Sequence, residues 1–194
     1  MPSTPTFITT SGPSIEPITL EEMKTRLRVS GCDFDSELSD MLISARQQVE
    51  ADTYRKLITQ TVVMYQDDFT SLLGSLEIRL APIQSITHVK YYDRDDVLQT
   101  YPAANYYSNL TSTPPAIELK QSKQWPNTSL YRPNRVEVTM VAGYGSTAAS
   151  VPRAAKLAIV EYCRAVWDGC EHNTDTYKRL IASLQWTAYP RVFA

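Results

Sequence analysis

Hydrophobic positions along the chain change their spacing twice. Between residues 18 and 57, apolar residues recur every three or four positions, as they do in amphipathic helices. Over residues 58–149 they alternate with polar residues, which predicts β-strands. Helical spacing returns over residues 150–186. We therefore expect an α+β protein, with a core of about four helices and an antiparallel β module inserted between the second and third helices.

Two helices are predicted before the β module. Thr19 and Glu22 have the spacing of a capping box, in which each side chain satisfies a backbone N–H of the other's turn. The second helix spans about residues 36–53, with an apolar stripe at Leu38, Met41, Leu42, Ala45 and Val49. Carboxylates at 33, 35 and 37 precede it, where the helix dipole favours negative charge. A calcium loop would also need a central glycine and a final glutamate, so we interpret these acids as helix-capping groups.

The clearest strand lies at the end of the β module. Val136, Val138 and Met140 alternate with polar residues and are expected to face inward. The strand ends at a turn with Gly143 and Gly145, and a helix begins at Val151-Pro152, where a missing N–H does no harm. A last helix is expected to begin at a cap formed by Asn173 or Thr174.

The longest segment without periodicity in the module is 121–134. It contains Trp125, which we expect to be exposed among Gln, Asn, Ser and Pro. A loop of this length inside a compact domain is either disordered or makes a contact, and we favour a contact. Trp125 is therefore a candidate partner-binding residue.

Both ends of the chain are predicted to lie outside the helical core. Residues 1–17 carry four prolines among Ser and Thr, which predicts an extended arm or a frayed terminus. Residues 187–194 contain Pro190 and show no helical period. This C-terminal tail and the residue before it are rich in side chains that anchor interfaces, so the tail either folds back on its own subunit or binds a neighbouring protein. The candidate partner-binding residues here are Trp186, Tyr189, Arg191, Val192 and Phe193.

Composition narrows the possible functions. The 21 acidic and 19 basic residues give a net charge of −2, which argues against a protein that grips many phosphates. The three cysteines, at 32, 163 and 170, lack metal-ligand spacing, and the last two are too far apart on one helix for a disulfide, which favours a reducing cytoplasm. The sequence shows no signal peptide and no apolar run near the ~20 residues of a membrane span, so no membrane association is expected.

The sequence contains no catalytic motif that its context supports. Gly143 and Gly145 fit a dinucleotide fingerprint, but a linker separates them from the next helix, so a turn is the better interpretation. The only histidines, His88 and His172, accompany no nucleophile motif. Neither zinc-binding spacing nor a P-loop is present. We expect no enzyme activity, no cofactor and no metal.

Several segments, taken in order, resemble one known family. The opening helix Ile18-Thr19-Leu20-Glu21-Glu22-Met23-Lys24 and the passage Leu57-Ile58-Thr59-Gln60-Thr61 come first. The strand–proline–strand corner Leu80-Ala81-Pro82-Ile83-Gln84-Ser85-Ile86 and the return to helix at 141–152 follow. Together the matches cover most of residues 18–170. This ordered set resembles the head–tail connector proteins of long-tailed bacteriophages, also called head–tail adaptor or head-completion proteins.

The resemblance implies a structural virion protein made in the cytoplasm of a bacterial host. Such proteins form a ring, commonly of twelve subunits, that docks beneath the portal protein in the neck of the virion. The ring extends the DNA channel, completes the DNA-filled head and joins it to the stopper or tail-completion protein. DNA would pass through without sequence-specific binding. In this setting the C-terminal tail is expected to contact the portal or a neighbouring subunit.

Two alternatives remain open from the sequence. One is a tail-end or tube-completion protein of the phage neck, which would bind tails and not portals. The other is a β-rich carbohydrate-binding module, in which Trp125, Tyr106 and Tyr107 form a stacking platform.

Overall fold

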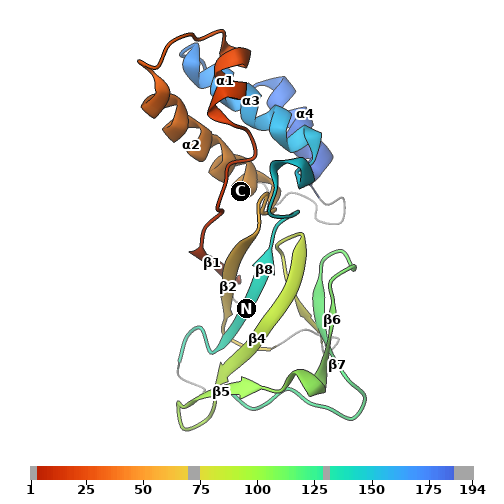
Figure 1. Cartoon of the computed structure of the whole chain (residues 1–194). Helices are drawn as coiled ribbons and strands as arrows, with labels where there is room; N and C mark the ends of the chain where they lie inside the picture. The colour runs from red at the N-terminus through yellow and green to blue at the C-terminus, as the bar shows by residue number, and fades with distance from the viewer. Residues whose placement is uncertain (1–3, 70–74, 129–131, 186–194) are drawn as a thin grey trace. The chain divides into compact units, whose positions relative to one another are not determined.

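The computed structural model of the chain describes residues 4–69, 75–128 and 132–185. The chain divides into two compact units, each of which is formed from two separate segments (Figure 1). The β unit comprises residues 1–12 and 59–143, and the helical unit comprises residues 13–58 and 144–194. Helices and antiparallel sheets are both present, which confirms the expected α+β class.

The β unit contains two antiparallel sheets. The five-stranded sheet has the order β1-β2-β8-β4-β5, and the three-stranded sheet has the order β3-β7-β6. The strands of the first sheet are β1 (Thr6–Ser11), β2 (Gln60–Gln66), β8 (Val136–Ala142), β4 (Ile83–Tyr92) and β5 (Leu98–Tyr101). The strands of the second are β3 (Ser75–Glu77), β7 (Ala116–Leu119) and β6 (Tyr106–Asn109). A short 3-10 turn, η1 (Ala103–Asn105), lies between β5 and β6.

Alternation along β8 separates the two faces of the larger sheet. Val136, Val138 and Met140 are completely buried, as predicted, whereas Glu137 and Thr139 on the other face are half-buried. The inner face belongs to a hydrophobic core that also includes residues of the smaller sheet. This core contains Val62, Met64, Phe69, Leu76, Ile78, Leu80, Val89, Tyr101, Tyr106 and Ile117, besides the three β8 residues.

The N-terminal segment was expected to be an extended arm, and part of it is a strand of the β unit. Residues 6–11 form β1, which pairs antiparallel with β2 from Thr6↔Tyr65 onwards. Phe7 packs against the core of the β unit, which gives this short strand an apolar anchor. The prolines on both sides of the strand concealed this β-branched stretch in the sequence, because they indicate loops.

The helical unit contains α1 (Leu20–Leu27), α2 (Asp35–Thr53), α3 (Arg153–Trp167) and α4 (Asp175–Leu184) (Figure 1). A second 3-10 turn, η2 (Ala148–Ser150), precedes α3. The apolar stripes of the four helices meet in a second core, where Val49, Ala158 and Cys163 are fully buried. This core also contains Ile18, Met23, Leu42, Ala45, Leu57, Ile58, Val151, Ala155, Ile159, Val160, Tyr177, Ile181 and Leu184.

The helix starts agree with the sequence signals only in part. The Thr19 hydroxyl accepts a hydrogen bond from the backbone N–H of Glu22 at 3.1 Å, as expected. The carboxylate of Glu22 accepts instead from Arg26 at 2.9 Å, so it does not complete the capping box. At α2 the acids lie in the first turn, but the N-cap residue is Phe34, and it forms no side-chain cap. The acids therefore act on the helix dipole and do not provide a side-chain cap.

The return from the β unit to the helices follows the predicted turn. Gly145 has φ +159°, and a Cβ there would lie 2.5 Å from the Ser150 hydroxyl oxygen, so the turn requires glycine. Pro152 occupies the N-cap position of α3. At α4 the Thr174 hydroxyl accepts from the backbone N–H of Tyr177 at 3.1 Å, which decides between the two candidate caps.

A buried ion-pair network joins α2 to the segment before α1 and to the segment after α2. Glu50 is only 5% exposed. One of its oxygens accepts from the Leu57 backbone N–H at 3.0 Å, and the other lies 3.1 Å from Lys56 Nζ and 3.5 Å from Arg46 Nη1. Arg46 Nε in turn donates to the Glu16 carboxylate at 2.8 Å. The network therefore fixes the entry to α1 and the exit from α2 against the same helix.

We predict that Glu50→Ala lowers the free energy of unfolding by about 3 kcal/mol, because it leaves the buried Leu57 N–H without an acceptor, removes the carboxylate that pairs with Lys56, and leaves the buried Arg46 with Glu16 as its one remaining carboxylate. Urea unfolding followed by circular dichroism measures the change. Glu22→Ala is the matched control, since it removes an exposed i,i+4 ion pair and should cost less than about 0.5 kcal/mol. Equal effects of the two substitutions would show that the network does not stabilise the helical unit.

Candidate assembly surfaces

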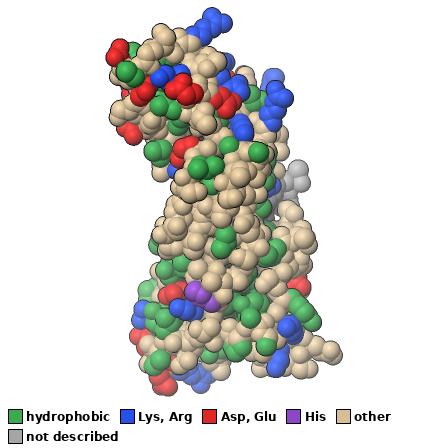
Figure 2. Space-filling view, viewed as in Figure 1, with side chains coloured by type: hydrophobic (Ala, Val, Ile, Leu, Met, Phe, Trp, Pro, Cys, Tyr) green, Lys and Arg blue, Asp and Glu red, His purple; other side chains and the backbone are tan. Residues whose placement is uncertain are grey.

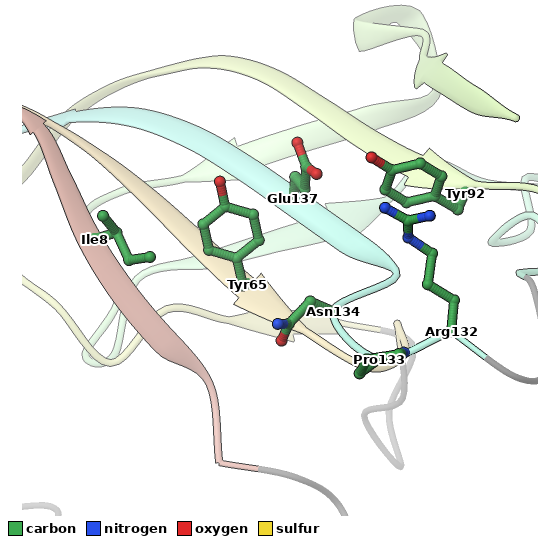
Figure 3. Close-up of a pocket in the computed structure, with 7 residues that line it drawn as sticks. All are labelled: Ile8, Tyr65, Tyr92, Arg132, Pro133, Asn134 and Glu137. Carbon is green, nitrogen blue, oxygen red and sulfur yellow. The ribbon is translucent and has the colours of Figure 1, made fainter. Parts of the chain in front are cut away.

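A pocket of about 490 Å³ lies on the outer face of the five-stranded sheet (Figure 3). Four strands contribute a side chain each, and the segment leading into β8 contributes the others. The strand residues are Ile8 on β1, Tyr65 on β2, Glu137 on β8 and Tyr92 on β4, and the segment supplies Arg132, Pro133 and Asn134. The pairings Tyr65↔Glu137 and Lys90↔Glu137 place three of these strands side by side in one register.

The cation of this pocket is held in a fixed place. Figure 3 shows the guanidinium of Arg132 beside the ring of Tyr92, and its central carbon lies 3.6 Å from the ring centroid. The Asp96 carboxylate lies 3.2 Å from Arg132 Nη1. On the same face of the sheet, burial lowers the pKa of His88, and the positive charge of Lys90 lowers it further. The arrangement suits recognition of a polar or aromatic surface, and it contains no nucleophile beside a base.

Trp125 is half-buried, and not exposed as the sequence suggested. Its indole stacks on the ring of Phe69, with centroids 4.5 Å apart and planes 5° from parallel. Tyr101 lies 5.3 Å from the indole and donates a hydrogen bond to the Gln124 carbonyl at 2.9 Å. Aromatic side chains from distant segments thus pack against the indole, which the polar sequence around Trp125 did not indicate. A role for Trp125 in binding a partner stays a prediction.

Trp125, Tyr106 and Tyr107, the residues of the possible carbohydrate-binding platform, do not lie on one flat surface of the β unit. Tyr106 is 6% exposed and stacks on Tyr101, whereas Tyr107 is 60% exposed and carries the Lys120 ammonium over its ring. Adjacent residues of a strand point to opposite faces, which explains the separation. The three aromatic residues therefore do not present stacked faces to one ligand.

The C-terminal candidates Trp186, Tyr189, Arg191, Val192 and Phe193 lie outside the described residues. The residues just before them are firmly placed. Gln185 Nε2 donates to the Asp52 carbonyl at 2.8 Å, and Arg55 Nε donates to the Leu184 carbonyl at 2.5 Å. The end of α4 is thus attached to the end of α2.

The titratable groups of the helical unit have structural roles. Burial raises the pKa of the Cys163 thiol to about 12, so it stays protonated in the core, while Cys32 and Cys170 are exposed. Burial and a hydrogen bond to Asp52 raise the pKa of Tyr177. Across residues 4–69, 75–128 and 132–185, no three His, Cys, Asp or Glu side chains gather in a way that could hold a metal ion. The helices in these ranges are all too short or too polar to span a bilayer.

Solved structures provide the comparison that identifies the fold. A chain of the neck of the empty gene transfer agent (GTA) particle, computed with C6 symmetry, matches with a TM-score of 0.80 and 17% identity over 95% of this chain and 97% of that chain. A chain of the native GTA virion matches with a TM-score of 0.74 and 15% identity, covering 95% and 97%. A chain of the native GTA neck with C12 symmetry matches at 0.69 and 16%, covering 94% and 97%. The fold is that of a GTA neck chain.

No protein-family model matches the sequence, and no curated protein does. The likeness therefore lies in the path of the backbone, which is shared along almost the whole of both chains at low sequence identity. The resemblance to phage connector proteins, which rested on short ordered segments, is confirmed at the level of the fold.

We predict that Trp125→Ala lowers the stability of the β unit by about 2 kcal/mol, because the indole leaves a gap against Phe69 and Tyr101. Trp125→Phe should keep most of the stacking and lose less than half as much. Urea unfolding of both variants, followed by circular dichroism, tests this. If Trp125→Ala is as stable as the unchanged protein, the indole does not anchor the 121–128 segment.

Proposed function

We propose that the protein is a structural component of the neck of a phage-like particle, where identical subunits form a ring beneath the portal. The observation that carries this proposal is the fold shared with a GTA neck chain over 95% of this chain and 97% of that one. The neck structures were computed with C6 and C12 symmetry, which supports a ring and is compatible with twelve subunits. In this role the ring extends the DNA channel, completes the filled head and joins it to the stopper or tail.

The charge of the chain suits a channel through which DNA must slide. The net charge is only −2, and strong basic contacts would retard the moving DNA. No sequence-specific contact with DNA is required, and no cofactor. The protein would be made in the bacterial cytoplasm and would function in the virion neck. The surface pocket around Arg132 is available for a protein neighbour in this assembly.

Co-sedimentation tests the proposal directly. Purified protein is mixed with isolated portal rings and, separately, with tails of the same particle, and the pellets are imaged by electron microscopy. We expect ring-shaped density at the outer end of the portal. Binding to tails alone would support a tail-end protein instead, and binding to neither would contradict a neck function.

Deletion of residues 187–194 should abolish portal binding while the helical unit stays folded. The reason for the second expectation is that the end of α4 is held by Asp52 and Arg55, which do not depend on the tail. Circular dichroism checks the fold, and co-sedimentation with portal rings checks docking.

Substitutions in the full-length protein show whether docking depends on the aromatic side chains of the tail or only on the presence of residues 187–194. Tyr189→Ala with Phe193→Ala should weaken docking about as strongly as the deletion, whereas Thr187→Ala should leave it unchanged. Normal docking by a folded truncated protein would show that the tail is not the portal contact.

A further inference from the structure

The outward face of α2 is not covered by the other helices of its unit. Its inward stripe includes Leu38, Leu42 and Val49, all buried in the helical core. The opposite side of the helix is exposed along its whole length, at Glu37, Asp40, Ile43, Ser44, Gln47, Ala51 and, at the C-cap, Tyr54. We call this the α2 face.

Two residues of the α2 face are unusual for a surface that meets only water. Ile43 is 39% exposed, and Tyr54 is 63% exposed. Tyr54 also has φ +54°, a left-handed conformation that costs a side-chain-bearing residue about 1 kcal/mol and that glycine or asparagine adopts more easily. An exposed aromatic ring held at this cost indicates a use outside the monomer.

The first half of the α2 face is acidic. Asp33, Glu37 and Asp40 are exposed and follow one another at helical spacing. Asp33, Glu37 and Asp40 form no ion pair with another described residue, whereas Asp35 pairs with Lys24 at 2.7 Å. The helix dipole accounts for acids in the first turn, and Asp40 lies beyond it.

Basic side chains without an ion-pair partner among the described residues lie on α3 and α4 of the same unit. On α4, Lys178 and Arg179 are exposed opposite the buried Tyr177 and Ile181. Arg153 and Lys156 lie in the first turn of α3, which contains no acid. None of these four side chains forms an ion pair within the described part of the chain. We call the surface with these residues the α3–α4 face.

The placement of the two basic residues on α3 is unfavourable in the monomer. The start of a helix carries partial positive charge, so Arg153 and Lys156 are repelled by the helix they belong to. In Figure 2, acidic and basic side chains are mixed over the left part of the helical unit, and basic side chains predominate along its right edge. The named charged residues of the α2 face and of the α3–α4 face nevertheless carry opposite charges.

We propose that the α2 face of one subunit packs against the α3–α4 face of a second copy. This inference rests on the proposed ring, which needs two different complementary faces on each subunit, because a head-to-tail contact must be repeated around the closed assembly. Ile43 and Tyr54 supply apolar area, and the charges select the orientation by attracting acid to base and repelling like faces. Packing also removes Tyr54 from water.

Two charge-reversed proteins test the pairing of these faces. Variant A carries Glu37→Lys and Asp40→Lys, so both of its faces are basic. Variant B carries Arg153→Glu, Lys156→Glu, Lys178→Glu and Arg179→Glu, so both of its faces are acidic. Either protein alone brings like charges together in a ring, whereas in an equal mixture every contact joins an A face to a B face of opposite charge.

Ring formation on isolated portal rings, imaged by electron microscopy at low salt, is the measurement. We expect A alone and B alone to form at least about tenfold fewer rings than the unchanged protein, and the mixture to restore them. A control with Asp95→Lys and Glu171→Lys raises the net charge as much as variant A does, at exposed sites outside both faces, and should assemble normally. Circular dichroism confirms that all variants are folded, and higher salt should reduce the defect of A and B.

The other outcomes separate this inference from the proposed function. If the unchanged protein forms rings on portals and A and B do so equally well, the subunit interface lies elsewhere and only the inference fails. If A and B fail and their mixture fails too, these two faces do not meet. If the unchanged protein forms no ring on portals, the proposed function fails, and the pairing of faces fails with it.

Discussion

A carboxylate removed from water must meet positive partners, and in the helical unit this requirement ties separate chain segments together. Glu50 holds Lys56 and the Leu57 N–H on the segment after α2, and Arg46 reaches from the same helix to Glu16 before α1. A buried charge that loses its partner costs several kcal/mol, so these segments stay at one end of α2. The backbone N–H of Tyr144 donates to the Leu57 carbonyl at 3.2 Å, which attaches the start of the second helical segment to the same place. These attachments fix where the chain enters α1, leaves α2 and begins the second helical segment, and the apolar stripes of the helices pack within those limits.

Sequence patterns predicted the fold best where one period extends over many residues. The alternation on β8 and the apolar stripes of α2 and α4 are consequences of burial on one side, and burial is what the pattern records. The patterns failed where a partner from far along the chain decides the outcome. β1 is a strand because β2, from a distant part of the chain, accepts it as a neighbour, and the local sequence has no distinct signal for this pairing. The capping box at Thr19 failed for a different, local reason: Arg26, one turn further along, takes the carboxylate of Glu22.

The candidate surfaces were less predictable than the fold, for the same physical reason. The polar sequence around Trp125 suggested exposure, but Phe69 and Tyr101 come from distant segments to stack with it. The acids at 33, 35 and 37 were interpreted only through the helix dipole, and this interpretation does not extend to Asp40, which lies beyond the first turn of α2. The positive φ of Tyr54 cannot be foreseen from a tyrosine, because this residue type gives no indication of a left-handed cap. The pocket around Arg132 depends on a register between strands that no local motif reveals.

The division of the helical unit into two segments has a consequence for folding. Helices α1 and α2 leave the ribosome before α3 and α4, and their inner stripes must wait until residues 59–143 have been made. Joining the two halves across such a long flexible chain would be slow and entropically unfavourable. The β unit removes this difficulty, because its pair Gln60↔Ala142 brings the two ends of the intervening chain together. Once β2 and β8 have paired, residues 58 and 144 are close together, so the two segments of the helical unit can meet as readily as if a short turn joined them.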